Sequence, residues 1–176
     1  MFHLMVGEIL FIFTGINQDN FFMIQRIQTV YLFLASAIIF SMFLSPLAEM
    51  VDSSGNYYSF GLTGIYKGMG ETAIKIESVL PLRFLVAVTA SLSLLTIFFY
   101  KRRILQLRIC IFNLMLLIGF YALFFFYYYH TKNRLDATGH FNLTVIFPVI
   151  ALILVFLATR GIRKDEILVR SYDRIR

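Results

Sequence analysis

The chain has 176 residues, about the size of one domain, and 59% of them are hydrophobic while only 15% are charged. Soluble domains are about half apolar and about a quarter charged, so this composition excludes an ordinary water-soluble fold. The net charge of +6 is compatible with a nucleic-acid partner, but the basic residues lie beside apolar blocks and form no groove interleaved with aromatic residues, so we expect none.

Residues 1–22 form an unusual start to such an apolar chain. They contain Glu8 and Asp19 but no Lys or Arg, so they lack the basic region with which a signal peptide begins. Their apolar part, residues 4–13, is too short to cross a bilayer. We expect translation to begin at Met23, with residues 1–22 an over-extended reading frame; the alternative is an interfacial N-terminal helix.

Four apolar blocks follow, each close to the roughly 20 residues that a helix needs to cross the hydrocarbon core of a bilayer. They predict an all-α integral membrane protein with four transmembrane helices in a bundle. The predicted spans are residues 29–47, 82–100, 109–129 and 141–159. Residues 23–160 are therefore expected to form the transmembrane domain, and residues 161–176 a cytoplasmic tail.

Small residues recur at every fourth position in the first two spans. Such spacing lets two helix backbones approach closely in lipid, where packing drives association. Together with one amide in the third span, they are our candidate helix-packing residues: Ala37, Ser41, Ser45, Ala87, Ser91 and Asn113. The alternative interpretation is a polar pathway through the bundle.

The loop of residues 48–81 connects the first two spans. Tyr58, Phe60 and Leu62 alternate with small residues, which favours a small β-hairpin in this first extracytoplasmic loop. The glycines of the loop do not have the spacing of a dinucleotide or phosphate loop, so we expect no nucleotide site there.

Cofactor and catalytic chemistry have little support in the sequence. His130 and His140 flank the outer ends of the third and fourth spans and could ligate haem or a metal, but no acidic or thiol ligand lies near them. The serines of the second span have no histidine at the same depth to act as a base. Cys110 is the only cysteine and forms no internal disulfide. We expect no cofactor, no metal and no enzymatic activity.

Basic residues on short connections predict the orientation of the chain. The connection before the third span contains Lys101, Arg102, Arg103 and Arg108 without an acid, whereas acids outnumber lysines in the loop of residues 48–81. Both termini are therefore expected in the cytoplasm.

The tail, GIRKDEILVRSYDRIR, has the pattern of a short amphipathic helix, because Leu168, Tyr172 and Ile175 fall on one helical face. Two interpretations stay open. The tail lies on the anionic inner leaflet, where each Lys or Arg contributes about 1 kcal/mol, or it docks a cytoplasmic partner. The candidate interaction residues are Lys101, Arg102, Arg103, Arg108, Arg163, Lys164, Leu168, Arg170, Tyr172, Arg174 and Ile175.

Three stretches carry a family resemblance: MIQRIQTVYLFLAS, IFFYKRRILQLRICIFNLML and RGIRKDEILVRSYDRIR. They resemble the bacterial four-span family called domain of unknown function 4293. The resemblance implies a multi-pass protein of the bacterial inner membrane and agrees with a start at Met23. It implies no activity, substrate or site residue.

The leading functional hypothesis is a non-enzymatic assembly or interaction subunit that uses its cytoplasmic face. Its expected partners are the lipid bilayer and a cytoplasmic or membrane protein. The alternatives are a small transporter or channel component and a haem- or metal-binding redox subunit that uses His130 and His140.

Overall fold

The computed structural model describes residues 27–68, 70 and 73–173, and the side chains of residues 101 and 168–173 are not described. The proposed start at Met23 therefore lies outside the described residues. The first described helix is Ile27–Ser41. It is followed by β1 (Ala48–Asp52), β2 (Tyr57–Gly61), β3 (Gly64–Lys67), β4 (Ile74–Glu77), α2 (Leu80–Phe98), α3 (Arg103–Leu135), β5 (Ala137–Phe141) and α4 (Phe147–Asp173).

Three helical segments are long and apolar enough to cross a membrane: Leu80–Phe98, Arg103–Leu135 and Leu143–Ile167. The described part of the first helix is apolar but shorter. At 1.5 Å per residue, the 33 residues of α3 extend about 50 Å, well beyond a hydrocarbon core of about 30 Å. This helix is therefore longer than a membrane crossing requires, and it contacts the sheet at its far end.

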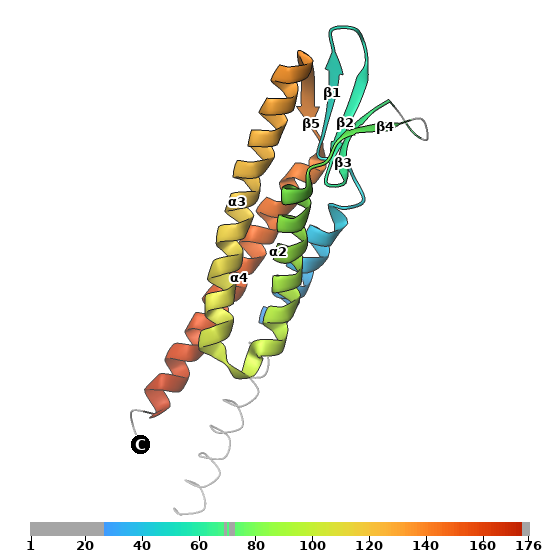
Figure 1. Cartoon of the computed structure of the whole chain (residues 1–176). Coiled ribbons are helices and arrows are strands. Elements are labelled where there is room, and N and C mark those ends of the chain that lie inside the picture. Colours follow the sequence, from blue (N-terminus) through green and yellow to red (C-terminus); the bar gives the residue numbers. More distant parts are fainter. Residues whose placement is uncertain (1–26, 69, 71–72, 174–176) are drawn as a thin grey trace, which may run out of the picture.

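The expectation of an all-α fold with a small hairpin was wrong. The five strands form one antiparallel sheet with the order β4-β3-β2-β1-β5, at one end of the helices (Figure 1). Strands β1 to β4 come from the loop before α2, whereas β5 comes from the connection between α3 and α4. The sheet is larger than a hairpin because these two separate connections pair with each other, Glu49 opposite His140.

One face of the sheet packs on the C-terminal part of α3. Phe60 of β2 meets Phe124 edge to face, with ring centroids 5.7 Å apart. Phe141 of β5 lies 4.6 Å from Tyr128 between ring centroids. Edge-to-face and tilted aromatic pairs at these distances contribute beyond the apolar area that they bury. The sheet is thus fixed to the helices by a small aromatic cluster.

Each long helix buries a single seam along its length. In α3 the buried residues recur every three or four positions, the spacing that keeps side chains on one helical face. The seam changes character along its length. At the end away from the sheet it contains Gln106, Cys110 and Asn113, and toward the sheet it contains Leu117 and Phe120.

Each of the four described helices contacts two of the others. Helix α3 packs against both α2 and α4. Ser36 of the first helix donates a hydrogen bond to the carbonyl oxygen of Ala90 in α2, at 3.1 Å. Gln28 of the same helix contacts Asp165 of α4. The first helix therefore lies between α2 and α4.

Candidate interaction site at the basic end of the helices

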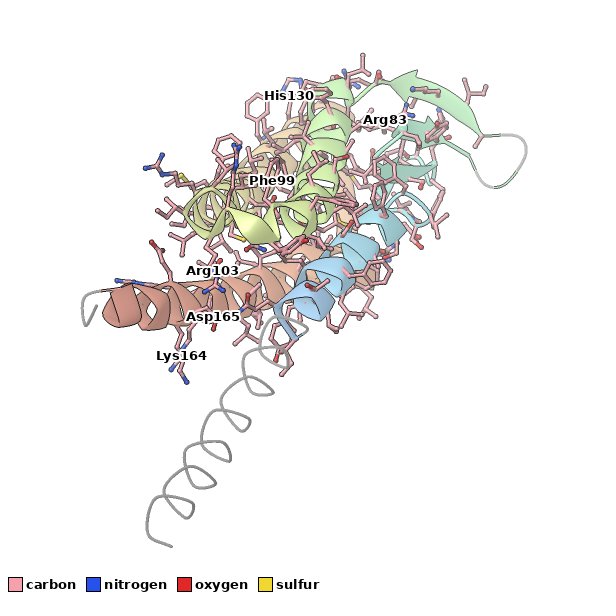
Figure 2. The ribbon with its side chains drawn as sticks, turned by 90° about the horizontal axis from the view of Figure 1, so that it is seen from below. Arg83, Phe99, Arg103, His130, Lys164 and Asp165 are labelled. Carbon is pink, nitrogen blue, oxygen red and sulfur yellow. The ribbon has the colours of Figure 1, made fainter. Side chains whose placement is uncertain are left out.

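The end of the helices opposite the sheet (Figure 1) carries a group of exposed cations, and we call it the basic end; Lys164 of this group is labelled in Figure 2. The group combines the start of α3 with residues 160–164 of α4. Its exposed members are Arg102, Arg108, Arg160, Arg163 and Lys164. Arg103, also at this end, is half-buried.

Asp165 of α4 is buried at the basic end and joins three helices. Its Oδ2 accepts a hydrogen bond of 2.7 Å from Nε2 of Gln28, which lies 137 residues earlier in the chain. Its backbone oxygen accepts a hydrogen bond of 3.2 Å from Nη1 of Arg103 in α3. We call Gln28, Arg103 and Asp165 the Asp165 junction. Because Asp165 is only 3% exposed, its charge is withdrawn from the surface that the cations occupy.

Gly161 makes the close contact between the first helix and α4 possible. A Cβ atom on this residue would lie 3.0 Å from Cγ and 3.0 Å from Nε2 of Gln28. A larger residue would therefore press on the side chain that bonds Asp165. Glycine is normally unfavourable inside a helix by about 1 kcal/mol relative to alanine, so its presence here has a packing reason.

The other carboxylate oxygen of Asp165, Oδ1, is buried and has no hydrogen-bond partner within the part of the chain that the structure describes. A buried polar atom left unpaired costs about 1–3 kcal/mol. Among the described residues, the junction therefore retains an unused acceptor at the basic end.

The structure brings five of the predicted interaction residues together at the basic end: Arg102, Arg103, Arg108, Arg163 and Lys164. Lys101 lies in the short 3-10 turn that precedes α3. Leu168, Arg170 and Tyr172 belong to the last turns of α4, where only the backbone is described. Arg174 and Ile175 lie outside the described residues.

The predicted packing residues lie in different surroundings. Asn113 is buried and its Nδ2 donates a 2.7 Å hydrogen bond to Oγ of Ser93, which joins α3 to α2. The small residues of the first two helices lie at or near the surface: Ala37, Ser45 and Ser91 are exposed, and Ser41 and Ala87 are half-buried. The described contact between these helices uses Ser36 instead.

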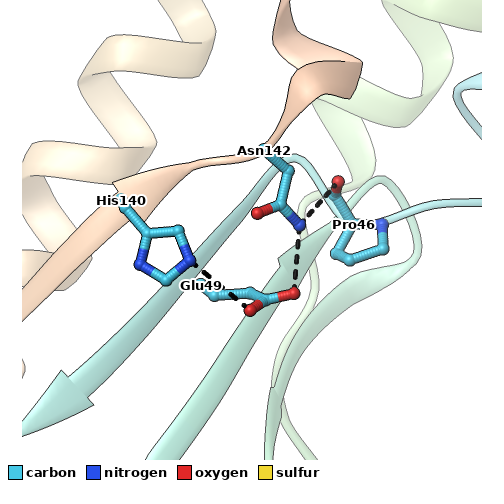
Figure 3. A network of polar contacts seen from close by, with 4 residues as sticks. All are labelled: Pro46, Glu49, His140 and Asn142. Atoms are coloured by element: carbon cyan, nitrogen blue, oxygen red, sulfur yellow. Dashed lines mark hydrogen bonds and ion pairs between the residues drawn. The ribbon is translucent and has the colours of Figure 1, made fainter.

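The two histidines lie near the opposite end and do not face each other. His130 stacks on Phe126 within α3. His140 of β5 lies beside Glu49, with Nε2 3.6 Å from Oε2 (Figure 3). Nδ2 of Asn142 donates to Oε1 of Glu49 at 3.0 Å and to the carbonyl oxygen of Pro46 at 3.4 Å. No group of three metal-ligating side chains occurs among the described residues.

Glu49 is held in its charged form by these neighbours. The hydrogen bond from Asn142 contributes most to lowering the pKa of Glu49, followed by a hydrogen bond from Tyr57. Burial, and then the hydrogen bond to Glu49, raise the pKa of Tyr57 to about 12. This network ties β1 to β5 and to the residue after it, so its role at the sheet is structural.

Sequence reasoning missed Gln28, Gly161 and Asp165. Asp165 lies in the charged tail, where an acid is expected to be solvated. A signal was nevertheless present, because Asp165 continues the buried series Ala158 and Ile162 at helical spacing. The partner of Asp165 has no sequence signal, since Gln28 lies at the other end of the chain.

Comparison with known proteins gives one result for this chain. The family model described as Domain of unknown function (DUF4293) matches residues 24–175, a range that contains every described residue. No curated protein matches the chain.

Proposed function

The chain belongs to the family described as Domain of unknown function (DUF4293), and from this premise we propose a non-enzymatic interaction subunit of the bacterial inner membrane. The proposed subunit uses its basic end to hold a cytoplasmic or membrane partner. The family brings no activity with it, so the proposal depends on the chain's own surfaces.

The apolar helix surfaces support membrane insertion as a four-helix bundle. Phe84 and Phe98 of α2 are 71% and 75% exposed, and Ile118 of α3 is 62% exposed. Side chains of this kind are stable outside a protein core when lipid surrounds them. The first helix is the proposed fourth span, because it packs between α2 and α4 and has the same apolar outer surface.

The distribution of charge supports an orientation with the basic end in the cytoplasm. Exposed cations at the ends of spans mark the cytoplasmic side of a membrane protein. At the sheet end the cations are balanced by acids, since Glu49, Asp52, Glu77 and Asp136 lie there beside the lysines and arginines. The sheet then lies outside the cytoplasm, and both chain termini lie inside it.

The observation that carries the interaction proposal is the burial of Asp165. An acid next to Lys164 would normally offset part of the local positive charge. Here the carboxylate faces Gln28 inside the protein, and the cations Arg160, Arg163 and Lys164 are left on the surface. Exposed charge of one sign speeds and selects association with an oppositely charged partner.

A purification of the full chain in mild detergent tests the proposal. The comparison uses a chain that ends after Ile167, which retains the Asp165 junction, and the double variant Arg163→Gln/Lys164→Gln. We expect the same partner proteins to be lost from both. The matched control is Lys67→Gln/Arg83→Gln, which removes the same charge near the sheet and should keep the partners. Identical partners in all four samples would contradict the proposal.

A second candidate function, a transporter component, is favoured by one observation. Oδ1 of Asn113 is buried and unpaired among the described residues, in the polar part of the α3 seam that also contains Gln106. Cysteines placed at Thr89 and Ser93 of α2, in a Cys110→Ser background, would react with water-soluble reagents if this region were wet. Complete protection at both positions would exclude the transporter function.

A further inference from the structure

The geometry of the last part of α4 bears on whether the basic tail lies on the inner leaflet or docks a cytoplasmic partner. We propose that the Asp165 junction holds this part as a rigid projection into the cytoplasm, where it meets an acidic soluble protein and does not lie on the lipid surface. This inference rests on the proposed function, because it takes the basic end as the interaction site.

The first step is the continuity of the helix. Helix α4 extends from Phe147 to Asp173 without interruption, and passes through Gly161. Its 27 residues span about 40 Å, about 10 Å more than the hydrocarbon core of a bilayer. A tail that lay flat on the leaflet would need a bend where the span ends, and α4 has none there.

The second step is the position of the junction. Asp165 is the last buried residue of α4 whose side chain is described. It is joined to the first helix through Gln28 and to α3 through Arg103. Two neighbouring helices therefore fix the direction of α4 at the point where its packing ends, so the turns that follow continue in that direction.

The third step is the surface opposite the junction. Arg163, Lys164 and Ile167 come three, four and seven residues after Arg160, so the four lie on one side of α4. Figure 2 shows Lys164 pointing away from the other helices, while Asp165 lies beside Arg103. Ile167 is 60% exposed within this cationic stripe. A partner with acidic residues around an apolar spot complements that stripe.

A lipid surface fits the stripe less well. A helix on a leaflet buries one apolar face and keeps its cations at the edges. Among the side chains described after the predicted span of residues 141–159, Ile162 is buried inside the protein and Ile167 lies among the cations, so these residues present no apolar face to a leaflet.

A spin-label experiment tests the rigid projection. Labels at Val30 and Ile167, both exposed, are placed in a Cys110→Ser full chain in lipid nanodiscs, either zwitterionic or rich in anionic lipid. We expect one narrow distance distribution that is the same in both lipids, with the Ile167 label accessible to a water-soluble relaxation agent. A distance that shifts with anionic lipid, with the label then protected from that agent, would show that the tail lies on the membrane and would overturn the inference.

The same distance measurement on variants of the Asp165 junction tests whether the junction sets the direction of α4. Asp165→Ala removes the acceptor of Gln28 and should broaden the distance distribution. Asp165→Asn keeps an acceptor oxygen, and Arg163→Gln removes a cation outside the junction, so both should retain the narrow distribution. A narrow distribution in Asp165→Ala would mean that the junction does not set the direction of α4.

Binding of a soluble poly-glutamate peptide to the zwitterionic nanodiscs tests the chemistry of the partner. Arg163→Gln/Lys164→Gln should weaken binding about threefold to tenfold. Asp165→Ala makes the protein more positive, so charge alone predicts tighter binding, whereas loss of the projection predicts weaker binding. Tighter binding by Asp165→Ala would contradict the inference. The proposed function would still stand if the chain ending after Ile167 loses its partner proteins.

Discussion

At the scale of single residues, Gly161 shows how a locally unfavourable choice supports a distant contact. Glycine in a helix costs about 1 kcal/mol relative to alanine, yet it lets the Gln28 side chain lie across α4 and bond Asp165. The hydrogen bond between two buried side chains contributes about 1–3 kcal/mol when its loss would leave a group unpaired. The contact therefore outweighs the helical preference.

This balance predicts that the effect of Gly161→Ala on the free energy of unfolding has opposite signs in the natural chain and in a Gln28→Ala chain. Gly161→Ala should lower the free energy of unfolding by about 1 kcal/mol in the natural chain, because its Cβ displaces Gln28. In a Gln28→Ala chain the same substitution should stabilise by up to about 1 kcal/mol, because only the helical preference remains. Unfolding by a denaturing detergent measures both values, and equal effects in the two backgrounds would contradict this explanation.

Glu49 gives a second prediction at this scale. The pKa of Glu49 is lowered in the folded protein, chiefly by the hydrogen bond from Asn142. Its carboxylate therefore stabilises the fold at pH values above 4.5, the ordinary pKa of the group. That contribution is lost as the pH falls below 4.5 and through the lowered pKa. Melting temperature measured against pH should fall more steeply there for the natural chain than for Glu49→Gln. Parallel curves would show that Glu49 contributes nothing to this pH dependence. Asp52 is present in both proteins, so its effect cancels in the difference between the two curves.

At the scale of elements, the strands show where local sequence patterns are sufficient. The alternation of Tyr58, Phe60 and Leu62 indicated β structure, and β2 lies there. Strand β5 was missed because ATGHF is short, contains glycine and has only one buried residue. Its identity as a strand comes from pairing with β1, which is distant in sequence. The helices were easier to predict, because length and apolar content are local properties.

The approach of β5 to β1 predicts a contrast between two glycines. A Cβ on Gly139 would lie 2.7 Å from the backbone oxygen of Glu49, so Gly139→Ala forces the strand to shift and should destabilise by about 1–3 kcal/mol. A Cβ on Gly119 of α3 meets no atom within 4 Å, so Gly119→Ala should be neutral or stabilising. Melting temperatures of the two variants check this order, and the reverse order would contradict the described packing of β5.

At the scale of the whole molecule, the basic end carries a cluster of exposed cations, whereas at the sheet end cations such as Arg134 lie among acids such as Glu77. The basic clusters in the sequence were sufficient to predict which residues share one end, and Arg102, Arg108 and Lys164 do so. The sequence was not sufficient to separate the surface charges from Asp165, because burial of that acid depends on Gln28 at the opposite end of the chain. Membrane insertion and orientation remain proposals that a labelling experiment tests.

The proposed orientation predicts opposite reactivity at the two ends. In a Cys110→Ser background, a cysteine at Ser54, in the exposed turn after β1, should react with a membrane-impermeant thiol reagent in intact spheroplasts. A cysteine at Arg163 should react only after the membrane is opened. Reaction of both in intact spheroplasts, or the reverse pattern, would contradict the orientation.

The pairing of β5 with β1 also has a consequence for biogenesis. Strands β1 to β4 precede α2 in the chain, whereas β5 follows α3. A ribosome therefore completes four strands before the fifth has been synthesised, and during that interval the edge of β1 that pairs with β5 is unpaired. Translation of α3 sets the length of that interval. Slow synthesis or insertion of α3 would thus prolong the time in which nascent chains can associate edge to edge, before β5 arrives and closes the sheet.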